Sequence, residues 1–190
     1  MRLENSFEVR ASPEAAWDLL MDVPRVVPCM PGATLDEVVD ESTWKATMQV
    51  KLGPIALTFA TDVRREEADE ADRRVKLAAD AREVRNRGQA SATIESTILA
   101  LDGGSRVDLV TELALSGAVA QYGRGMIQDI SSQLVQSFAQ CLQSQLTAAP
   151  EEAEQAVAAQ AKPVSGLSLF FGAVRRSVGR LFGRGKTREQ

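Results

Sequence analysis

Apolar and polar residues alternate along much of the first 115 residues, and this pattern predicts seven β-strands. Successive side chains of a strand point to opposite faces of a sheet, so each alternating segment has one apolar face. The segments are residues 3–9, 34–39, 48–52, 55–59, 73–81, 90–98 and 107–115. Turn-forming residues separate them, as at Gly53-Pro54 and Asp102-Gly103-Gly104. We therefore expect neighbouring segments to pair as an antiparallel sheet.

Two further segments predict helices. Ser12 is a favourable N-cap residue and Pro13 suits the first helical position, so a helix from there to about Asp22 is expected. A long amphipathic helix is predicted from about Ala120 to Leu146. Its apolar residues, spaced by three and four, are Tyr122, Met126, Ile127, Ile130, Leu134, Phe138, Cys141 and Leu142. An antiparallel sheet covered by one long helix is a two-layer α+β domain.

Residues 1–147 are thus predicted to form one domain, and the remaining residues cannot extend its core. Residues 148–162 are rich in Ala, Glu and Gln, so we expect a flexible linker. Residues 163–190 form a basic tail whose helical wheel has one apolar face with arginines beside and opposite it. The residues of this pattern are Leu167, Phe170, Phe171, Val174, Arg175, Arg176, Val178, Arg180, Leu181, Phe182 and Arg184.

The tail has the pattern of a helix that lies in a membrane interface. From Lys162 onward the chain has seven Lys or Arg and one acidic residue, whereas acidic residues are in excess before that point. Each basic residue near an anionic membrane contributes about 1 kcal/mol to binding. We therefore predict that the tail binds an anionic membrane surface. A groove on another protein is the alternative, and we expect no nucleic-acid partner because the body is acidic.

Composition narrows the possible chemistry. The chain has no histidine, which excludes Ser-His-Asp triads, His-ligated zinc and an imidazole base. We expect no metal site and no catalytic residues. The two cysteines are Cys29 and Cys141, and Cys29 is not expected to be a redox thiol because no second cysteine is near it in sequence.

The start of the chain and its hydropathy predict a location. The first residues lack the apolar core of a signal peptide, and no segment supplies the roughly 20 apolar residues of a membrane span. We expect a cytoplasmic protein, peripheral on the inner face of the cell membrane.

Small side chains on the predicted sheet leave two interpretations open. In the segment 90–98 the apolar face carries Ala90, Ala92 and Ile94 in place of larger residues. Such a face either packs closely against the long helix or borders an apolar cavity.

Four blocks of the sequence resemble the CoxG family, the G subunits of carbon monoxide dehydrogenase, within the START-like (SRPBCC) helix-grip superfamily. They are Phe7–Asp22, Pro28–Ala33, Lys51–Ile55 and Ser116–Gly125, in the expected order, and with the elements around them they cover residues 3–146. The resemblance implies a sheet that wraps the long helix and leaves an apolar cavity between them. It also implies association with a molybdenum-containing CO dehydrogenase or a related hydroxylase, whose electrons must reach membrane quinones.

With this fold in view, ligand contacts are expected on the first helix, the sheet, the long helix and the loop Pro28–Gly32. That loop is either a gate over the cavity or a packed connection, and Tyr122 with Arg124 could hydrogen-bond a polar ligand head. The predicted ligand-binding residues are Trp17, Leu20, Met21, Pro28, Met30, Phe59, Ala92, Ile94, Tyr122, Arg124, Met126, Ile130 and Leu134.

Three functions follow from these observations. The first is a non-catalytic carrier that moves a respiratory quinone, menaquinone or ubiquinone, between the membrane and a CO dehydrogenase. The second is an adaptor that recruits the dehydrogenase to the membrane without ligand transport. The third is an enzyme of the cyclase or hydratase type, which the lack of histidine and of a convergent acid–base pair disfavours. For the carrier, the transported quinone is the only cofactor expected.

Overall fold

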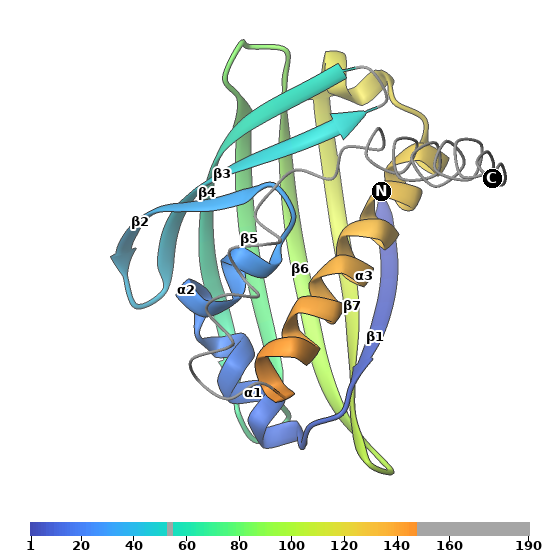
Figure 1. The fold of residues 1–190 in the computed structure, drawn as a ribbon. Coiled ribbons are helices and arrows are strands. Elements are labelled where there is room, and N and C mark those ends of the chain that lie inside the picture. The colour runs from blue at the N-terminus through green and yellow to red at the C-terminus, as the bar shows by residue number, and fades with distance from the viewer. Residues whose placement is uncertain (53–54, 148–190) are drawn as a thin grey trace, which may run out of the picture.

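Seven strands form a single antiparallel sheet in the computed structural model, which describes residues 1–52 and 55–147. The order across the sheet is β1-β7-β6-β5-β4-β3-β2, so every strand pairs with its neighbour in sequence except β1, which pairs with β7 (Figure 1). The bounds are β1 Arg2–Val9, β2 Ala33–Asp40, β3 Thr43–Leu52, β4 Ile55–Asp69, β5 Arg74–Glu83, β6 Gly88–Leu101 and β7 Gly104–Gly117. The predicted α+β class and the seven antiparallel strands are confirmed.

Helices occupy the connection between β1 and β2 and the segment after β7. They are α1 (Pro13–Met21), α2 (Val23–Val26), the 3₁₀ helices η1 (Val27–Cys29) and η2 (Ala118–Gln121), and α3 (Arg124–Thr147). Ser12 caps α1, since its Oγ accepts a hydrogen bond from the N–H of Ala15 at 3.2 Å. The long helix starts at Arg124, slightly later than predicted, because η2 and an extended Tyr122 intervene.

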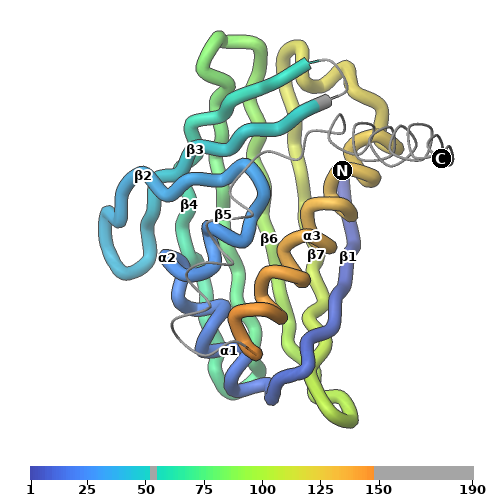
Figure 2. The backbone as a smooth tube through the Cα atoms, viewed as in Figure 1, coloured from blue at the N-terminus to red at the C-terminus, as the bar shows by residue number. Residues whose placement is uncertain are grey.

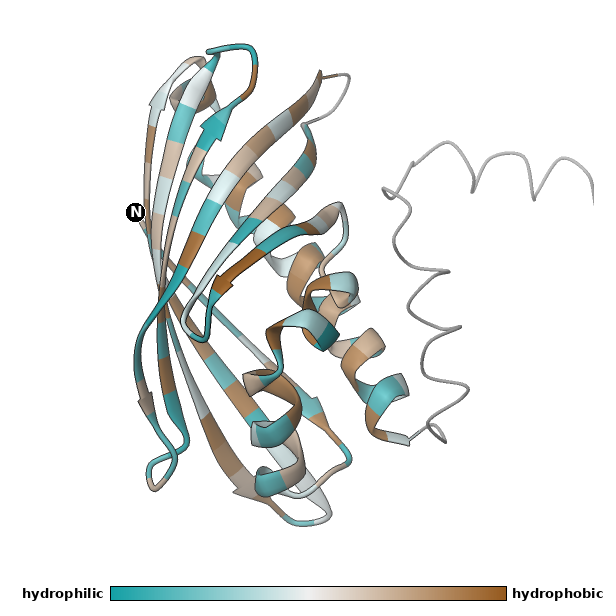
Figure 3. Ribbon diagram, turned by 90° about the vertical axis from the view of Figure 1, so that its left-hand side faces the viewer, coloured by the Kyte–Doolittle hydropathy of each residue, from teal (hydrophilic) through white to brown (hydrophobic). Residues whose placement is uncertain are grey.

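The sheet curves strongly, and all helices lie on its concave side (Figures 2 and 3). Helix α3 runs beside the edge strand β1 and also contacts η1 and α1. A polar seam joins it to β1: Asn5 donates to Ser131 Oγ at 2.9 Å and accepts from Ser132 Oγ at 3.2 Å. This seam fixes α3 to the β1 edge of the sheet, and the curvature of the sheet brings β3 opposite the other side of the helix.

Two separate groups of buried residues lie on the concave face. The larger, which we call the α1 cluster, consists of Phe7, Val9, Ala16, Trp17, Leu19, Val26, Cys29, Val75, Ile98, Val107, Cys141 and Leu142. The smaller, the η2 cluster, consists of Leu57, Phe59 and Val119.

Hydropathy of the helices bears on membrane insertion. Among the helices of residues 1–52 and 55–147, none combines the length and the apolar character needed to cross a bilayer. The predicted linker and membrane-binding tail, residues 148–190, lie outside the described residues.

Candidate functional site

A row of partly buried side chains separates the two buried clusters. On β5, Leu77 packs against the α1 cluster and Ala81 against the η2 cluster, so Ala79, which lies between them on the same face, marks the boundary. Its cross-strand neighbours are Ala92 on β6 and, beyond it, Leu113 on β7. All three are only partly buried and belong to neither cluster.

A hollow of about 350 Å³ adjoins this row. Its lining is Met1 with residues 78–80, 91–93 and 112–114, so it includes residues of both faces of β5, β6 and β7 and none of the described helices. In a close-packed interior a central apolar row would be buried by the facing helix. Here α3 makes most of its contacts with β1, and the row consists of two alanines and a leucine that remain partly exposed.

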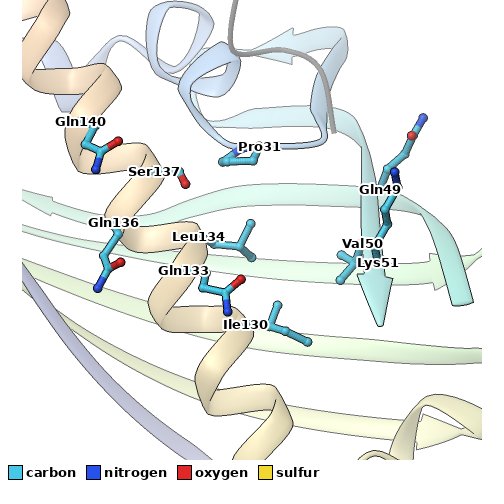
Figure 4. Close-up of a pocket in the computed structure, with 10 residues that line it drawn as sticks. All are labelled: Pro31, Gln49, Val50, Lys51, Ile130, Gln133, Leu134, Gln136, Ser137 and Gln140. Carbon is cyan, nitrogen blue, oxygen red and sulfur yellow. The ribbon is translucent and has the colours of Figure 1, made fainter. Parts of the chain in front are cut away.

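A second pocket opens between α3 and β3. Its volume is about 250 Å³, and Figure 4 shows its lining side chains. They are Pro31, Gln49, Val50, Lys51, Ile130, Gln133, Leu134, Gln136, Ser137 and Gln140.

The lining of this pocket is apolar inside and polar at the rim. Val50 from β3 faces Ile130 and Leu134 from α3 (Figure 4). Ile130 and Leu134 are four residues apart, so they lie on the same face of α3. Gln133, Gln136 and Gln140 of α3 contribute neutral amides, whereas Gln49 and Lys51, on either side of Val50, point away from α3 (Figure 4). Lys51 is the one charged residue among the lining residues. An apolar body with a neutral hydrogen-bonding end matches this lining.

The segment after η1 forms one border of the pocket. The N–H of Gln49 on β3 donates to the carbonyl of Gly32 at 2.8 Å. Gly32 has φ +82°, and a Cβ at this position would collide with the carbonyl oxygen of Gln49. Only glycine therefore permits this close approach of the segment to β3.

A disulfide fixes the same segment to α3. Cys29 in η1 is bonded to Cys141 in α3, with a Cα–Cα distance of 5.3 Å. Sequence distance did not reveal this pairing, because the fold brings together two cysteines that are 112 residues apart. With both sides of the segment held, the structure favours the packed connection over the gate, the two interpretations that the sequence left open for Pro28–Gly32.

A buried carboxylate, that of Glu83, lies near the η2 cluster. Glu83, cross-strand from Phe59, accepts hydrogen bonds from the backbone N–H groups of Arg85 at 2.8 Å and Arg87 at 3.1 Å. The guanidinium of Arg87 donates to Glu83 at 2.8 Å and to the carbonyl of Ala56 at 2.9 Å. The hydrogen bond from the Arg87 side chain is the main cause that lowers the pKa of Glu83 to about 2. The pair is therefore ionised at neutral pH and joins the β5–β6 hairpin to β4.

Comparison with family models places the chain. The model for the carbon monoxide dehydrogenase G subunit (CoxG) matches residues 6–147. The chain belongs to the CoxG family. The match covers the sheet from the end of β1 onward and every residue that lines the two pockets except Met1, and it confirms the resemblance seen in the four sequence blocks.

Solved structures agree with a helix-grip fold of the SRPBCC type. A conserved protein from Geobacillus kaustophilus is 19% identical with a TM-score of 0.69, covering 77% of this chain and 95% of the other. Ara h 8.0201 is 16% identical with a TM-score of 0.56, covering 77% and 97%. Zhui aromatase/cyclase from Streptomyces sp. is 14% identical with a TM-score of 0.53, covering 77% and 93%. No curated protein matched the chain. At these identities the likeness shows the fold alone.

The structure brings part of the predicted ligand-binding set to the two pockets. Ile130 and Leu134 line the pocket beside β3, and Ala92 lines the hollow at the central row. Phe59 is in the η2 cluster, and Tyr122 packs against it. Ile94 is half-buried on the same face as Ala92.

The other predicted residues lie elsewhere. Trp17 is a member of the α1 cluster, and Leu20 and Met21 pack against it. Pro28 and Met30 are half-buried in and after η1. Arg124 is exposed and donates to the carbonyl of Arg2 at 3.3 Å, and Met126 is 45% exposed.

Several pocket residues were missed by the sequence analysis. Val50 and Leu134 face each other from elements far apart in sequence, and only Leu134 was predicted. Gln133, Gln136 and Gln140 sit at the polar edge of the helical pattern, where they resemble ordinary solvent-exposed residues. The spacing of three and four along α3 is the one signal that groups them.

Proposed function

We propose that this protein is a non-catalytic carrier that moves an isoprenoid quinone, menaquinone or ubiquinone, between the membrane and a molybdenum-containing CO dehydrogenase or related hydroxylase. The observation that carries the proposal is the partly exposed apolar row Ala79–Ala92–Leu113 between two buried clusters. An isoprenoid chain needs an apolar cover to leave the bilayer, and this row offers apolar surface that the protein itself leaves partly uncovered.

The pocket beside β3 supports a ligand with a polar end. Ile130 and Leu134 continue the apolar surface along α3, while the glutamine rim supplies neutral donors and acceptors. Quinone carbonyls accept hydrogen bonds and carry no charge, so they fit amide donors better than they fit a cluster of charges. The family name supplies the partner, because CoxG is named for carbon monoxide dehydrogenase.

In this proposal the tail binds the protein to the membrane. The tail sequence combines an apolar stripe with arginines, whereas anionic lipid would repel the acidic body alone. Removing residues 163–190 is expected to abolish binding of the full-length protein to anionic vesicles. Equal binding by the truncated protein would remove the membrane step from the proposal.

The test of the carrier uses full-length protein purified from a quinone-producing host. Its organic extract should contain an isoprenoid quinone, and the protein should accelerate dehydrogenase-dependent quinone reduction. The Ala92→Trp variant places an indole in the central row and should lose both properties. Gln89→Trp is the matched control, because Gln89 is an exposed residue of the same strand on the opposite face.

Two outcomes would overturn the carrier. The first is an extract without quinone, and the second is equal stimulation by Ala92→Trp and Gln89→Trp in folded protein. Stimulation that needs the tail but is insensitive to Ala92→Trp would support the adaptor function in its place. Turnover of a substrate by the protein alone would indicate the enzymatic alternative seen among its structural relatives.

A further inference from the structure

The two cysteines of the chain form a buried covalent link at the edge of the β3 pocket. Cys29 and Cys141 are each 1% exposed. On α3, Cys141 directly follows Gln140 and lies one turn beyond Ser137, and both of these line the pocket. On the other side, Pro31 lines the pocket two residues after Cys29. The disulfide therefore joins the two chain segments that meet at this border.

Noncovalent contacts complete a bridge from one wall to the other. The bond from Gln49 to Gly32 ties the segment to β3, and the disulfide ties it to α3. Gln145 of α3 adds weaker fastening, since its amide donates to the carbonyl of Arg25 at 3.0 Å and lies 3.1 Å from Cys29 Sγ. The disulfide is the one covalent element in this bridge.

Without the disulfide, α3 would keep its polar seam with β1 but would lose its covalent tie to the η1 side. The seam lies in the first half of α3, at Ser131 and Ser132, whereas Cys141 lies near its end. The helix end and the segment 29–32 would then move more freely relative to each other. Separation of the helix end from the segment 29–32 would then cost less free energy and would occur more often. Each separation widens the entrance to the pocket.

We infer that the Cys29–Cys141 disulfide is a redox-sensitive clamp on the ligand pocket, a regulation that rests on the proposed carrier function. The oxidised form holds α3 against the segment 29–32 and slows exchange of the ligand. A dithiol reductant releases the clamp by thiol–disulfide exchange: it transfers two electrons and two protons, leaves two cysteine thiols in the protein and becomes a disulfide itself. Disulfides that are reduced and reformed in this way are typical of redox sensing in reducing compartments.

Burial of the sulfurs adds a reciprocal expectation. A reductant reaches them only when the segment opens, so a ligand that stabilises the closed pocket should slow reduction. Ligand retention and disulfide retention are then two measures of one equilibrium.

The experiment compares oxidised and dithiothreitol-reduced full-length protein, with alkylation of the unfolded chain to count zero or two thiols. Hydrogen–deuterium exchange should rise in residues 27–33 on reduction. A short-chain menaquinone should dissociate about tenfold faster from the reduced form, a change that corresponds to about 1.4 kcal/mol. The ligand should also slow the appearance of thiols in the oxidised form.

The Cys29→Ser, Cys141→Ser double variant is the control for the reductant. It should match the reduced protein in both measurements and should not respond to dithiothreitol, because the chain has no other cysteine. If it does not fold, the reduced wild-type chain still decides the question.

Unchanged exchange and an unchanged dissociation rate in protein with two titrated thiols would overturn the clamp while leaving the carrier intact. If menaquinone binds to neither form, the carrier fails, and the exchange measurement alone decides whether the clamp exists.

Discussion

The α1 end and the middle of the concave face are built differently. At the α1 end, Trp17 and Leu142 are 8% and 2% exposed and fill the space between sheet and helices. In the middle, Ala79, Ala92 and Leu113 occupy equivalent inward positions yet remain partly exposed. The same sheet face is thus a closed core at one end and a partly uncovered apolar surface further along.

This difference separates the stabilising part of the domain from the part available for a ligand. Large side chains from α1 and α3 reach the sheet where α1 lies against β6 and β7, so burial stabilises the fold there. Further along the same face, the row contains Ala79 and Ala92, whose side chains are small. Substitutions at the α1 end and in the central row should therefore act on different properties.

The largest expected effect is at the filled end. Trp17→Ala removes a large buried side chain and should lower the free energy of unfolding by about 3–5 kcal/mol. Chemical denaturation monitored by circular dichroism measures this. Menaquinone affinity of the folded fraction should change little. A Trp17→Ala protein that keeps its stability but no longer binds menaquinone would contradict this prediction. Trp17 would then be a ligand contact, as the sequence analysis expected.

Reduction of the disulfide is expected to have the second-largest effect on stability. The Cys29–Cys141 bond joins the filled end to the pocket border, and losing a native disulfide typically lowers stability by about 2–4 kcal/mol. Denaturation of oxidised and reduced protein under otherwise identical conditions gives the difference. Identical denaturation midpoints with two titrated thiols would mean that the link contributes nothing to the filled end.

Acid should affect the far end of the sheet through Glu83. Its pKa is lowered to about 2 in the fold, so the unfolded chain binds a proton more readily. The Glu83 contribution is fully present above about pH 4.5, the usual pKa of the group, and is lost as the pH falls towards 2. Glu83→Gln should remove this dependence, as the slope of stability against pH between 4.5 and 2 would show. Parallel slopes for the two proteins would contradict the assignment.

The smallest effect on stability is expected in the central row. Enlarging a residue in a filled core typically costs about 1–3 kcal/mol, so Ala92→Trp should cost less than about 1 kcal/mol if the row borders free space. Gln89→Trp on the opposite face sets the baseline. Thermal unfolding of both variants tests the point. A large loss of stability confined to Ala92→Trp would show that the row is filled, and the α1 end and the central row would then not differ.

Local signals predicted most of the fold. The period-two pattern located all seven strands, and Ser12-Pro13 located the start of α1, because these features depend on neighbours in the chain. Strand lengths were underestimated, as in β4, which continues through the charged segment to Asp69. There the polar residues are exposed and the backbone pairing with β5 maintains the strand.

The site was harder to predict because it depends on distant parts of the chain. Ile130 and Leu134 were found from helical spacing, whereas their partner Val50 is on β3. Cys29 and Cys141 meet only through the packing of η1 against α3. Arg124 has the hydrogen-bonding groups expected for a ligand head, but its position at the start of α3 directs it to the carbonyl of Arg2.

The most direct test of the carrier is to observe which alanine methyl groups a quinone touches. Methyl NMR spectra of alanine-labelled full-length protein, recorded with and without a short-chain menaquinone, distinguish ligand contacts in the central row from contacts in the α1 cluster. We predict shifts for the methyl groups of Ala79 and Ala92 in the central row and none for Ala16, which is buried in the α1 cluster. Shifts centred on Ala16, or no shifts in the central row at saturating menaquinone, would contradict a ligand site between the two clusters.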